Sequence, residues 1–365
     1  MKKLIVCGLV AAMLLTGCGS GSGETTAAGT TESATVSTTA APTTELPTEA
    51  PTTVPTEPAP VDINPLTGEA LEEVRDLRPI AVMLNNHSHA LPQCGLGQAD
   101  MIYEILAEGA TTRLMAVFTD AHDAGPVGPV RSLRAYYLDI MRGYDAICVS
   151  AGGSREADNM IYNLGYDRIN GIGGAGAGYF YRDAWRRDNR GYEHSLFIEG
   201  SDLYKGAEEG GFRLTETEGK DYGLTFDEDV PFGGEEIGTI TVHFRDGGKT
   251  TELSYHEDLG GYTAFQQGMD LIDGNTDEAV LFRNVLVLFA DSGVMDGEGH
   301  LKVQTTGEGQ GYYARDGRLI EITWKRADET SPYEYYDAQG NALSFGVGKT
   351  YTAVIPTGSP VDLAD

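Results

Sequence analysis

The sequence predicts a mixed α/β N-terminal domain, with helices on a mixed sheet, followed by a smaller β-rich C-terminal domain. Two observations support this prediction. Before about residue 225, short apolar runs bounded by polar turns are interleaved with segments of helical spacing. From Ile237 onward, polar and apolar residues alternate between hairpin turns. We therefore place the α/β domain at 61–225 and the β-rich domain at 237–360, with the acidic stretch 224–238 as the seam.

Strands open the α/β domain. The runs 80–84, 101–106 and 114–118 are apolar almost throughout, and short continuous apolar runs are typical of strands that are buried on both faces. A further run of this kind, 146–149, follows the first predicted helix.

Two helices are predicted in the same domain. From Val130 to Tyr144 the apolar residues keep helical spacing, and Pro129 stands just before them, where helices tolerate proline. Ser154 is a suitable N-cap for a second helix that runs to about Leu164.

The C-terminal domain shows the period of two that half-buried strands have. Alternating residues occupy 239–244 and 320–324, and the Asp-Gly pairs at 246–247 and 316–317 are typical of hairpin turns. This half is therefore predicted to be made of antiparallel strands.

The first eighteen residues have the features of a lipoprotein export signal. Lys2 and Lys3 precede an apolar run at 4–15 that is too short to span a bilayer, and Thr16-Gly17-Cys18 follows. Cleavage would leave Cys18 as the mature N-terminus, where a diacylglyceryl thioether places two acyl chains on one residue and anchors it stably. We expect the membrane to be a partner through this lipid, and the protein to lie on the outer face of the cytoplasmic membrane.

Residues 19–60 are predicted to form a disordered tether. The segment is rich in Gly and Ser, then in Thr, Pro, Ala and Glu, and it holds no aromatic and no basic residue. Such a composition buries too little apolar surface to offset the entropy lost on ordering. The folded part is therefore expected to begin near Val61.

Charge is abundant and unevenly distributed. With 55 acidic and 26 basic residues the chain carries a formal net charge of −29, which argues against nucleic acid as a partner. Residues 62–200 nevertheless contain 12 arginines and no lysine, against 19 acidic residues. Because a guanidinium group grips carboxylate or phosphate at two points, this half is where we expect an anion to bind.

The sharpest candidate for an anion site is the segment 128–134, which holds Arg131 and Arg134. A helix that starts here would expose unpaired N–H groups, with both arginines projecting from one side of it. Ligands gather at the carboxyl ends of strands in sheets of this kind, so other strand ends are expected to share one Arg-lined cleft with this segment. The polar residues at those ends are Ser154, Asn85, Asn86 and His87.

A second Arg-rich piece, 181–187, contributes Arg182 and leads to His194. In an alternative interpretation the protein is a cell-envelope hydrolase or transferase, in which His194 or Glu104 handles protons while Arg131, Arg134 and Arg182 hold a charged group. No nucleophile is paired with a base at diagnostic spacing, so the favoured interpretation is a binding module that holds an anionic envelope component or an acidic partner in the Arg-lined cleft.

Neither a cofactor nor a metal is predicted. Residues 171–176 match the dinucleotide-binding fingerprint by letters, but no clear strand precedes them and no amphipathic helix follows. His87 and His89 place two imidazoles close together, yet no third ligand stands at a recognisable spacing. Cys94 and Cys148 are the cysteines left to pair outside the cell, and their spacing does not decide whether they do.

Several motifs resemble the YerB lipoprotein family of Gram-positive bacteria, and they cover nearly all of the chain after the tether. The resemblance implies an exported lipoprotein with N-terminal and C-terminal family domains and no assigned biochemical function. The motifs are Arg78-Pro-Ile-Ala-Val-Met-Leu-Asn-Asn-His87, Gln98-Ala-Asp-Met-Ile-Tyr-Glu104, Gly128-Pro-Val-Arg-Ser132, Ala151-Gly-Gly-Ser154 and Ile322-Thr-Trp324.

Overall fold

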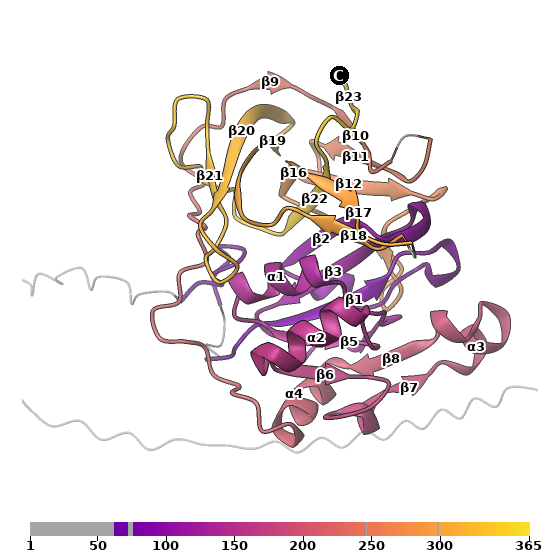
Figure 1. Ribbon diagram of the computed structural model, residues 1–365. Helices are drawn as coiled ribbons and strands as arrows, with labels where there is room; N and C mark the ends of the chain where they lie inside the picture. The colour runs from indigo at the N-terminus through magenta and orange to yellow at the C-terminus, as the bar shows by residue number, and fades with distance from the viewer. Residues whose placement is uncertain (1–61, 72–75, 246, 298) are drawn as a thin grey trace, which may run out of the picture. The chain divides into compact units, whose positions relative to one another are not determined.

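A computed structural model of the chain describes residues 62–71, 76–245, 247–297 and 299–365 (Figure 1). The predicted signal at 1–18 and the predicted tether at 19–60 lie outside the described residues. Ala59–Asp365 forms one compact unit. The predicted fold class is confirmed within it, since the N-terminal region is a mixed sheet with few helices and the C-terminal region is β-rich.

One sheet of 11 strands joins the two regions, in the order β21-β20-β19-β16-β22-β2-β3-β1-β5-β6, with β9 paired to β20. The N-terminal region supplies β1 (Ile80–Asn85), β2 (Met101–Leu106), β3 (Thr112–Phe118), β5 (Ile147–Ser150) and β6 (Arg168–Asn170). The C-terminal region supplies β9 (Glu235–Glu236), β16 (Asn284–Ala290), β19 (Gly307–Arg315), β20 (Arg318–Arg326), β21 (Glu334–Tyr336) and β22 (Thr350–Pro356).

The two regions meet at β22, which pairs in parallel with β2 on one side and with β16 on the other. Residues 350–355 of this strand are buried, as expected of a strand in the middle of a sheet that is covered on both faces. The domains predicted at 61–225 and 237–360 are therefore linked by one continuous sheet.

Strand direction brings several strand ends to one edge of this sheet. β1 runs parallel to β5 and antiparallel to β3, and β3 runs antiparallel to β2. The carboxyl ends of β1, β2 and β5 consequently lie at the same edge. We call it the carboxyl edge, and it comprises 85–87, Glu108 and 150–154.

Smaller sheets flank the large one. A five-stranded sheet has the order β13 (Met269–Asp270), β12 (Gly261–Gln266), β11 (Thr250–His256), β10 (Thr239–His243) and β23 (Val361–Ala364). A three-stranded sheet has the order β4 (Pro126–Val127), β8 (Leu196–Glu199) and β7 (Tyr181–Arg182). Two hairpins are β14 (Ile272–Asp273) with β15 (Glu278–Ala279) and β17 (Ser292–Val294) with β18 (Leu301–Val303).

Helices are few and short in the described residues. The α-helices are α1 (Ala135–Gly143), α2 (Arg155–Leu164), α3 (Ala184–Asn189) and α4 (Gly200–Glu209). The 3-10 helices are η1 (Ser88–Ala90), η2 (Leu96–Gln98), η3 (Glu108–Ala110), η4 (Ala177–Tyr179) and η5 (Tyr192–His194). Ser154 caps α2 as predicted, because its hydroxyl accepts the N–H of Ala157 at 3.2 Å.

The large sheet separates two hydrophobic cores. Ile80, Val82 and Leu84 of β1 enter one core, together with residues of β10, β12 and α4. Ala81 and Met83 enter the other, together with residues of α1 and α2, which Figure 1 shows on one face of the sheet. Successive side chains of a strand point to opposite faces, so a continuous apolar run is what a strand between two cores requires.

The helix predicted from Val130 begins instead at Ala135. Residues 130–133 are extended, since the N–H of Arg131 donates to the carbonyl of Met83 at 2.8 Å and the carbonyl of Arg131 accepts from Ala151 at 3.0 Å. The segment therefore bridges the ends of β1 and β5. Arg134 is the N-cap residue of α1, whereas Arg131 lies in the extended segment before it, so the two arginines do not project together from one side of a helix.

No helix in the described part of the chain is long and apolar enough to cross a membrane. Cys94 and Cys148 are both buried and both free, so no disulfide joins them in this structure. Burial raises the pKa of the Cys94 thiol to about 11 and that of the Cys148 thiol to about 12, which keeps both in the protonated form at neutral pH.

Gly200 offers a test of the packing of α4 after β8. A Cβ at this position would lie 1.9 Å from the carbonyl oxygen of Ala121. We expect Gly200→Ala to lower the free energy of unfolding by roughly 3 kcal/mol, because the backbone must shift to relieve the clash. Gly178→Ala is the control, since no atom lies within 4 Å of a Cβ there. Equal urea midpoints for the two variants would contradict the packing described.

Candidate functional site

The carboxyl edge brings four of the predicted site residues together. The amide nitrogen of Asn85 lies 2.9 Å from Nδ1 of His194, and the His87 ring stacks on the His194 ring with centroids 5.0 Å apart. Arg131 joins them through Glu193, the neighbour of His194, whose Oε2 accepts from Nη2 of Arg131 at 2.8 Å. The ends of β1 and β5 meet here, as predicted, because the two strands pair in parallel.

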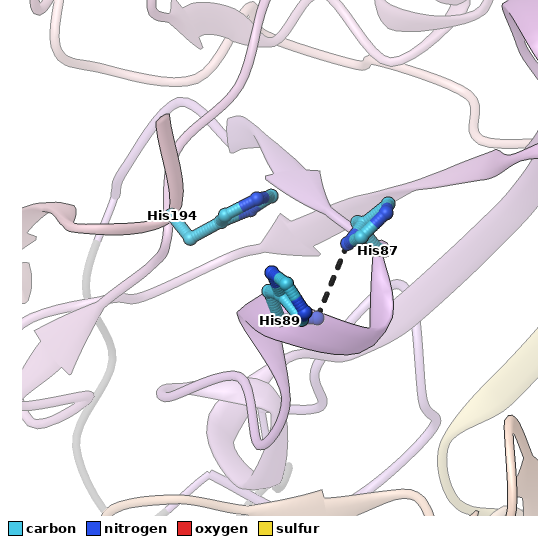
Figure 2. A group of neighbouring side chains, drawn as sticks. All are labelled: His87, His89 and His194. Carbon is cyan, nitrogen blue, oxygen red and sulfur yellow. Dashed lines mark hydrogen bonds between the residues drawn. The ribbon is translucent and has the colours of Figure 1, made fainter. Parts of the chain in front are cut away.

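His89 completes a group of three histidines with His87 and His194 (Figure 2). One ring nitrogen from each lies within 4.8 Å of the others. His87 caps η1, since its Nδ1 accepts the N–H of His89 at 3.2 Å. His87 is half-buried, His89 is exposed and His194 is buried, so the group opens to solvent on one side.

Burial lowers the pKa of His194 below its ordinary value. Glu193 opposes this effect, and the neighbouring His87 and Arg131 add to it. The imidazole of His194 is therefore held mainly in its neutral form at neutral pH.

Arg134 is held by Glu108 rather than by solvent. Its side chain is 11% exposed, and its Nη2 donates to Oε2 of Glu108 at 2.8 Å while its Nε contacts Oε1 of the same carboxylate. Arg113 also pairs with Glu108, at 3.3 Å. Burial would raise the pKa of Glu108, but the hydrogen bond from Arg134 and the charges of both arginines outweigh it and lower that pKa. This triad is a fixed part of the edge.

Arg131 is the more accessible of the two arginines in the predicted anion site at 128–134. Its side chain is 30% exposed, and that of its partner Glu193 is 56% exposed. Arg131 also lies near enough to Arg113 to add to the lowering of the Arg113 pKa, which burial and Arg134 bring to about 10.

Arg182 supports the turn that carries His194. Its Nη1 donates to the carbonyl of Tyr192 at 2.6 Å and to Oγ of Ser195 at 3.3 Å. Its guanidinium also lies over the Tyr192 ring, 3.4 Å from the centroid. Both ends of η5 are thereby fixed.

Ser154 lines a hollow of about 570 Å³ beside the start of α2, together with Arg155 and His300. Arg131 and Arg134 lie outside that hollow. The single Arg-lined cleft expected from the sequence is thus divided into a hollow at α2 and an exposed ion pair at Arg131.

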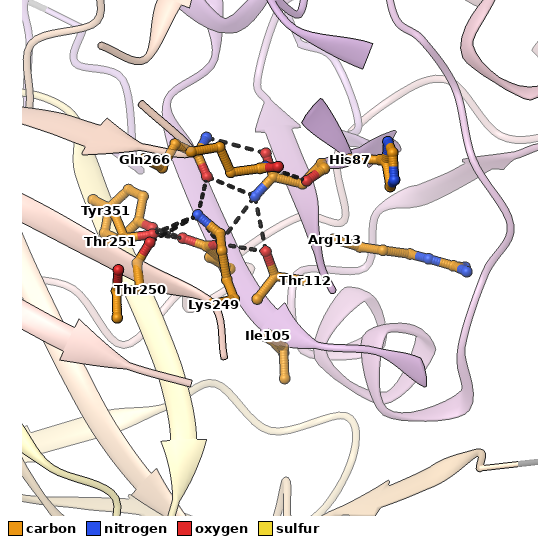
Figure 3. Close-up of polar contacts among 12 residues, drawn as sticks. His87, Ile105, Thr112, Arg113, Lys249, Thr250, Thr251, Gln266 and Tyr351 are labelled. Carbon is orange, nitrogen blue, oxygen red and sulfur yellow. Dashed lines mark hydrogen bonds and ion pairs between the residues drawn. The ribbon is translucent and has the colours of Figure 1, made fainter. Parts of the chain in front are cut away.

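Asn86 and Glu104 belong to a buried polar network (Figure 3). Glu104 accepts from Nδ2 of Asn86 at 2.9 Å and from Oγ1 of Thr251 at 2.7 Å, and its Oε1 lies 3.3 Å from Nζ of Lys249. Thr112 and Tyr351 donate to the same carboxylate. Burial lowers the pKa of Lys249, an effect that Glu104 opposes. The network joins β2, β3 and β22 of the large sheet to the start of β11 in the five-stranded sheet.

His194 and Glu104, the two alternatives for handling protons in the catalytic interpretation, are not joined by a hydrogen bond in the described residues. His194 contacts Asn85 and Glu193, whereas Glu104 faces Lys249 in the interior. Their proposed roles in proton transfer remain predictions.

Two family models match consecutive parts of this chain. The "Protein of unknown function (DUF3048) N-terminal domain" matches residues 66–213, and the DUF3048 C-terminal domain matches residues 240–352. A curated protein, "Putative lipoprotein YerB" of Bacillus subtilis (strain 168), is 30% identical over 296 residues, which are 80% of this chain and 86% of that protein. The chain belongs to the DUF3048 family.

A solved structure supports the same relationship for this DUF3048 protein. The crystal structure of YerB protein from Bacillus subtilis matches with a TM-score of 0.72 and 27% sequence identity, over 83% of this chain and 99% of that chain. The resemblance predicted from the motifs is confirmed, and so is the arrangement of a mixed N-terminal region with a β-rich C-terminal region.

Sequence reasoning on this DUF3048 protein missed Lys249, the buried partner of Glu104. It named His194 but did not place this residue beside His87 and His89. No spacing in the chain indicates either contact, since both come from segments that only the tertiary fold brings together.

Removing the charge of Glu104 should show how much the buried charge of Lys249 destabilises the fold when it has no partner. We expect Glu104→Gln to lower the free energy of unfolding by about 3 kcal/mol, because it leaves an ammonium group buried without a counter-charge. Adding Lys249→Met should recover part of the loss, so the two changes are not additive in a urea double-mutant cycle.

An exposed pair provides the matched control. Glu308 and Lys325 are 72% and 51% exposed and lie 3.9 Å apart, so Glu308→Gln and Lys325→Met should couple by less than about 0.5 kcal/mol. Additivity of the Glu104 and Lys249 variants would show that their charges do not interact.

Proposed function

We propose that this DUF3048 protein is a lipid-anchored extracellular binding module that holds an anionic envelope component, or an acidic segment of a partner, at the carboxyl edge. Two observations support the location at the membrane. Cys18 follows a charged start and a short apolar run, and the curated relative carries the name of a lipoprotein. Arg131 is proposed as the first contact with the ligand.

The distribution of charge at the carboxyl edge supports an anion. The whole chain has a formal net charge of −29, yet within the described residues Arg113, Arg131 and Arg134 at this edge pair with two carboxylates, Glu108 and Glu193. A ligand carboxylate or phosphate would therefore meet an excess of guanidinium groups in a protein that otherwise repels it.

The observation that carries the proposal is the exposure of the Arg131–Glu193 pair. Exposed ion pairs contribute only about 0–1 kcal/mol to the stability of a protein. A ligand that displaces Glu193 from Arg131 would therefore destabilise the protein very little. A free guanidinium fork then offers two parallel N–H donors to the incoming oxyanion. The ion pair of Arg131 with Glu193 is therefore compatible with replacement of Glu193 by a ligand oxyanion.

The other predicted residues are proposed to prepare this surface. Arg134 fixes Glu108, Arg182 fixes η5, and Asn85 orients His194. The hydrolase or transferase alternative has less support, since His194 and Glu104 lie in separate side-chain networks.

The anchor is tested by replacing the lipidated residue. We expect Cys18→Ser to abolish incorporation of labelled fatty acid and to shift the full-length chain from the membrane fraction to the medium, because the thioether has no sulfur to form on. Cys7→Ser is the matched control, since Cys7 leaves with the signal and its loss should change neither measurement. Labelled fatty acid on the Cys18→Ser protein would contradict the assignment.

The binding surface is tested with inorganic phosphate and citrate as probes. Calorimetric titration of the detergent-purified full-length protein, at low salt and with a chelator present, should show binding that Arg131→Ala weakens about tenfold, as loss of a charge-assisted hydrogen bond predicts. Arg318→Ala is the control, because Arg318 pairs with the exposed Glu236 in the C-terminal region. Equal affinities in the wild type and in Arg131→Ala would contradict the role of Arg131.

A further inference from the structure

We infer that His87, His89 and His194 form a binding site for a divalent transition-metal ion, with Zn²⁺ as the expected cation. The inference goes beyond the proposed anion binding and does not depend on it. Neither the family description nor the relatives assign a metal to this chain.

The spacing of the three rings supports the site. The ring centroids lie 5.1, 5.0 and 5.6 Å apart in the three pairs, and one nitrogen of each ring lies within 4.8 Å of the other two. Zn–N bonds of about 2.0–2.1 Å in tetrahedral geometry place ligand nitrogens about 3.4 Å apart. Closing the remaining gap needs only small side-chain rotations, and His89 is free to make them because it is exposed.

The backbone around the site is already organised. His87 and His89 are held on η1 by the capping contact between them, while His194 ends η5, which Arg182 fixes at both ends. Figure 2 shows the three rings facing a common space from these two short turns. A metal ion would therefore link two segments that are far apart in sequence and already rigid, which reduces the ordering cost of binding.

His194 also has hydrogen-bond partners of the kind that orient histidine ligands at metal sites. A ligating histidine usually has its other nitrogen in a hydrogen bond that fixes the ring. Nδ1 of His194 lies 2.9 Å from the Asn85 amide, and Nε2 lies 3.4 Å from Oε1 of Glu193. Because each ring nitrogen of His194 already has a partner, the nitrogen that binds the cation gives up its contact, and the other nitrogen keeps the contact that orients the ring.

The ligand set also indicates the class of cation. Three neutral imidazoles suit Zn²⁺, Cu²⁺ and Ni²⁺ better than the oxygen-seeking Ca²⁺ and Mg²⁺. With three protein ligands, a tetrahedral ion keeps one position for water or another ligand. That position is expected on the open side of the group, where His89 is exposed.

The test uses full-length protein, purified in detergent without a polyhistidine tag and treated with a chelator that is then removed. Titration with Zn²⁺ in a calorimeter should show one ion per chain with micromolar or tighter affinity. Because His89 is exposed, His89→Gln should fold normally and weaken binding about 100-fold or more, as loss of one of three ligands predicts. Co²⁺ substitution should give the visible spectrum of a tetrahedral site, and His89→Gln should abolish it.

The control is His243→Gln, since His243 pairs with Asp362 in the five-stranded sheet and lies outside the group. It should leave Zn²⁺ affinity unchanged. Absence of micromolar binding in the wild type would overturn the inference, as would equal affinities in the wild type and His89→Gln. Because phosphate binding is measured with a chelator present, failure of the metal site leaves the role of Arg131 separately testable.

Discussion

The parallel pairing of β22 with β2 and β16 is the constraint on which the rest of this structure depends. It inserts one of the last strands of the chain between the two regions, so that neither region has a complete sheet without the other. The same pairing places Tyr351 of β22 beside Glu104 of β2, where both lie in the network that receives Lys249. A buried ion pair contributes little net stability, but it penalises any other register strongly, because a shifted strand would leave a charge without its partner. We interpret the network as a device that specifies how the regions join.

That junction in turn fixes the carboxyl edge. Once β2, β3 and β1 are in register, the ends of β1 and β5 lie side by side, and residues 130–133 cross between them as an extended segment. This crossing presents Arg131 to solvent next to Glu193, while Arg134 turns back to Glu108. Accessibility of the two arginines therefore follows from backbone path rather than from their spacing in sequence.

The strands were predictable because their signal is local. The run at 80–84 lies between two cores, so nearly every residue in it is apolar, and no tertiary information is needed to see this. The start of α1 was not predictable, since Val130 and Leu133 satisfy helical spacing equally well when they are buried from an extended segment. Ser154 was correctly placed as a cap because capping uses only neighbouring residues. The contacts of His194 and Lys249 were beyond reach, because they join segments through the fold and leave no periodicity in the chain.

The two proposed ligands would share one carboxylate, and this relates the sites to each other. Oε2 of Glu193 pairs with Arg131 at 2.8 Å, while Oε1 lies 3.4 Å from Nε2 of His194. A cation held by the histidines attracts this carboxylate and weakens its hold on Arg131, which frees the guanidinium for an anion. An anion on Arg131 conversely releases Glu193 toward the cation. Because coupling between two binding sites is reciprocal, each ligand would favour the other to the same extent. In this arrangement Glu193, which no sequence motif singles out, would govern the chemistry of the edge more than either arginine does.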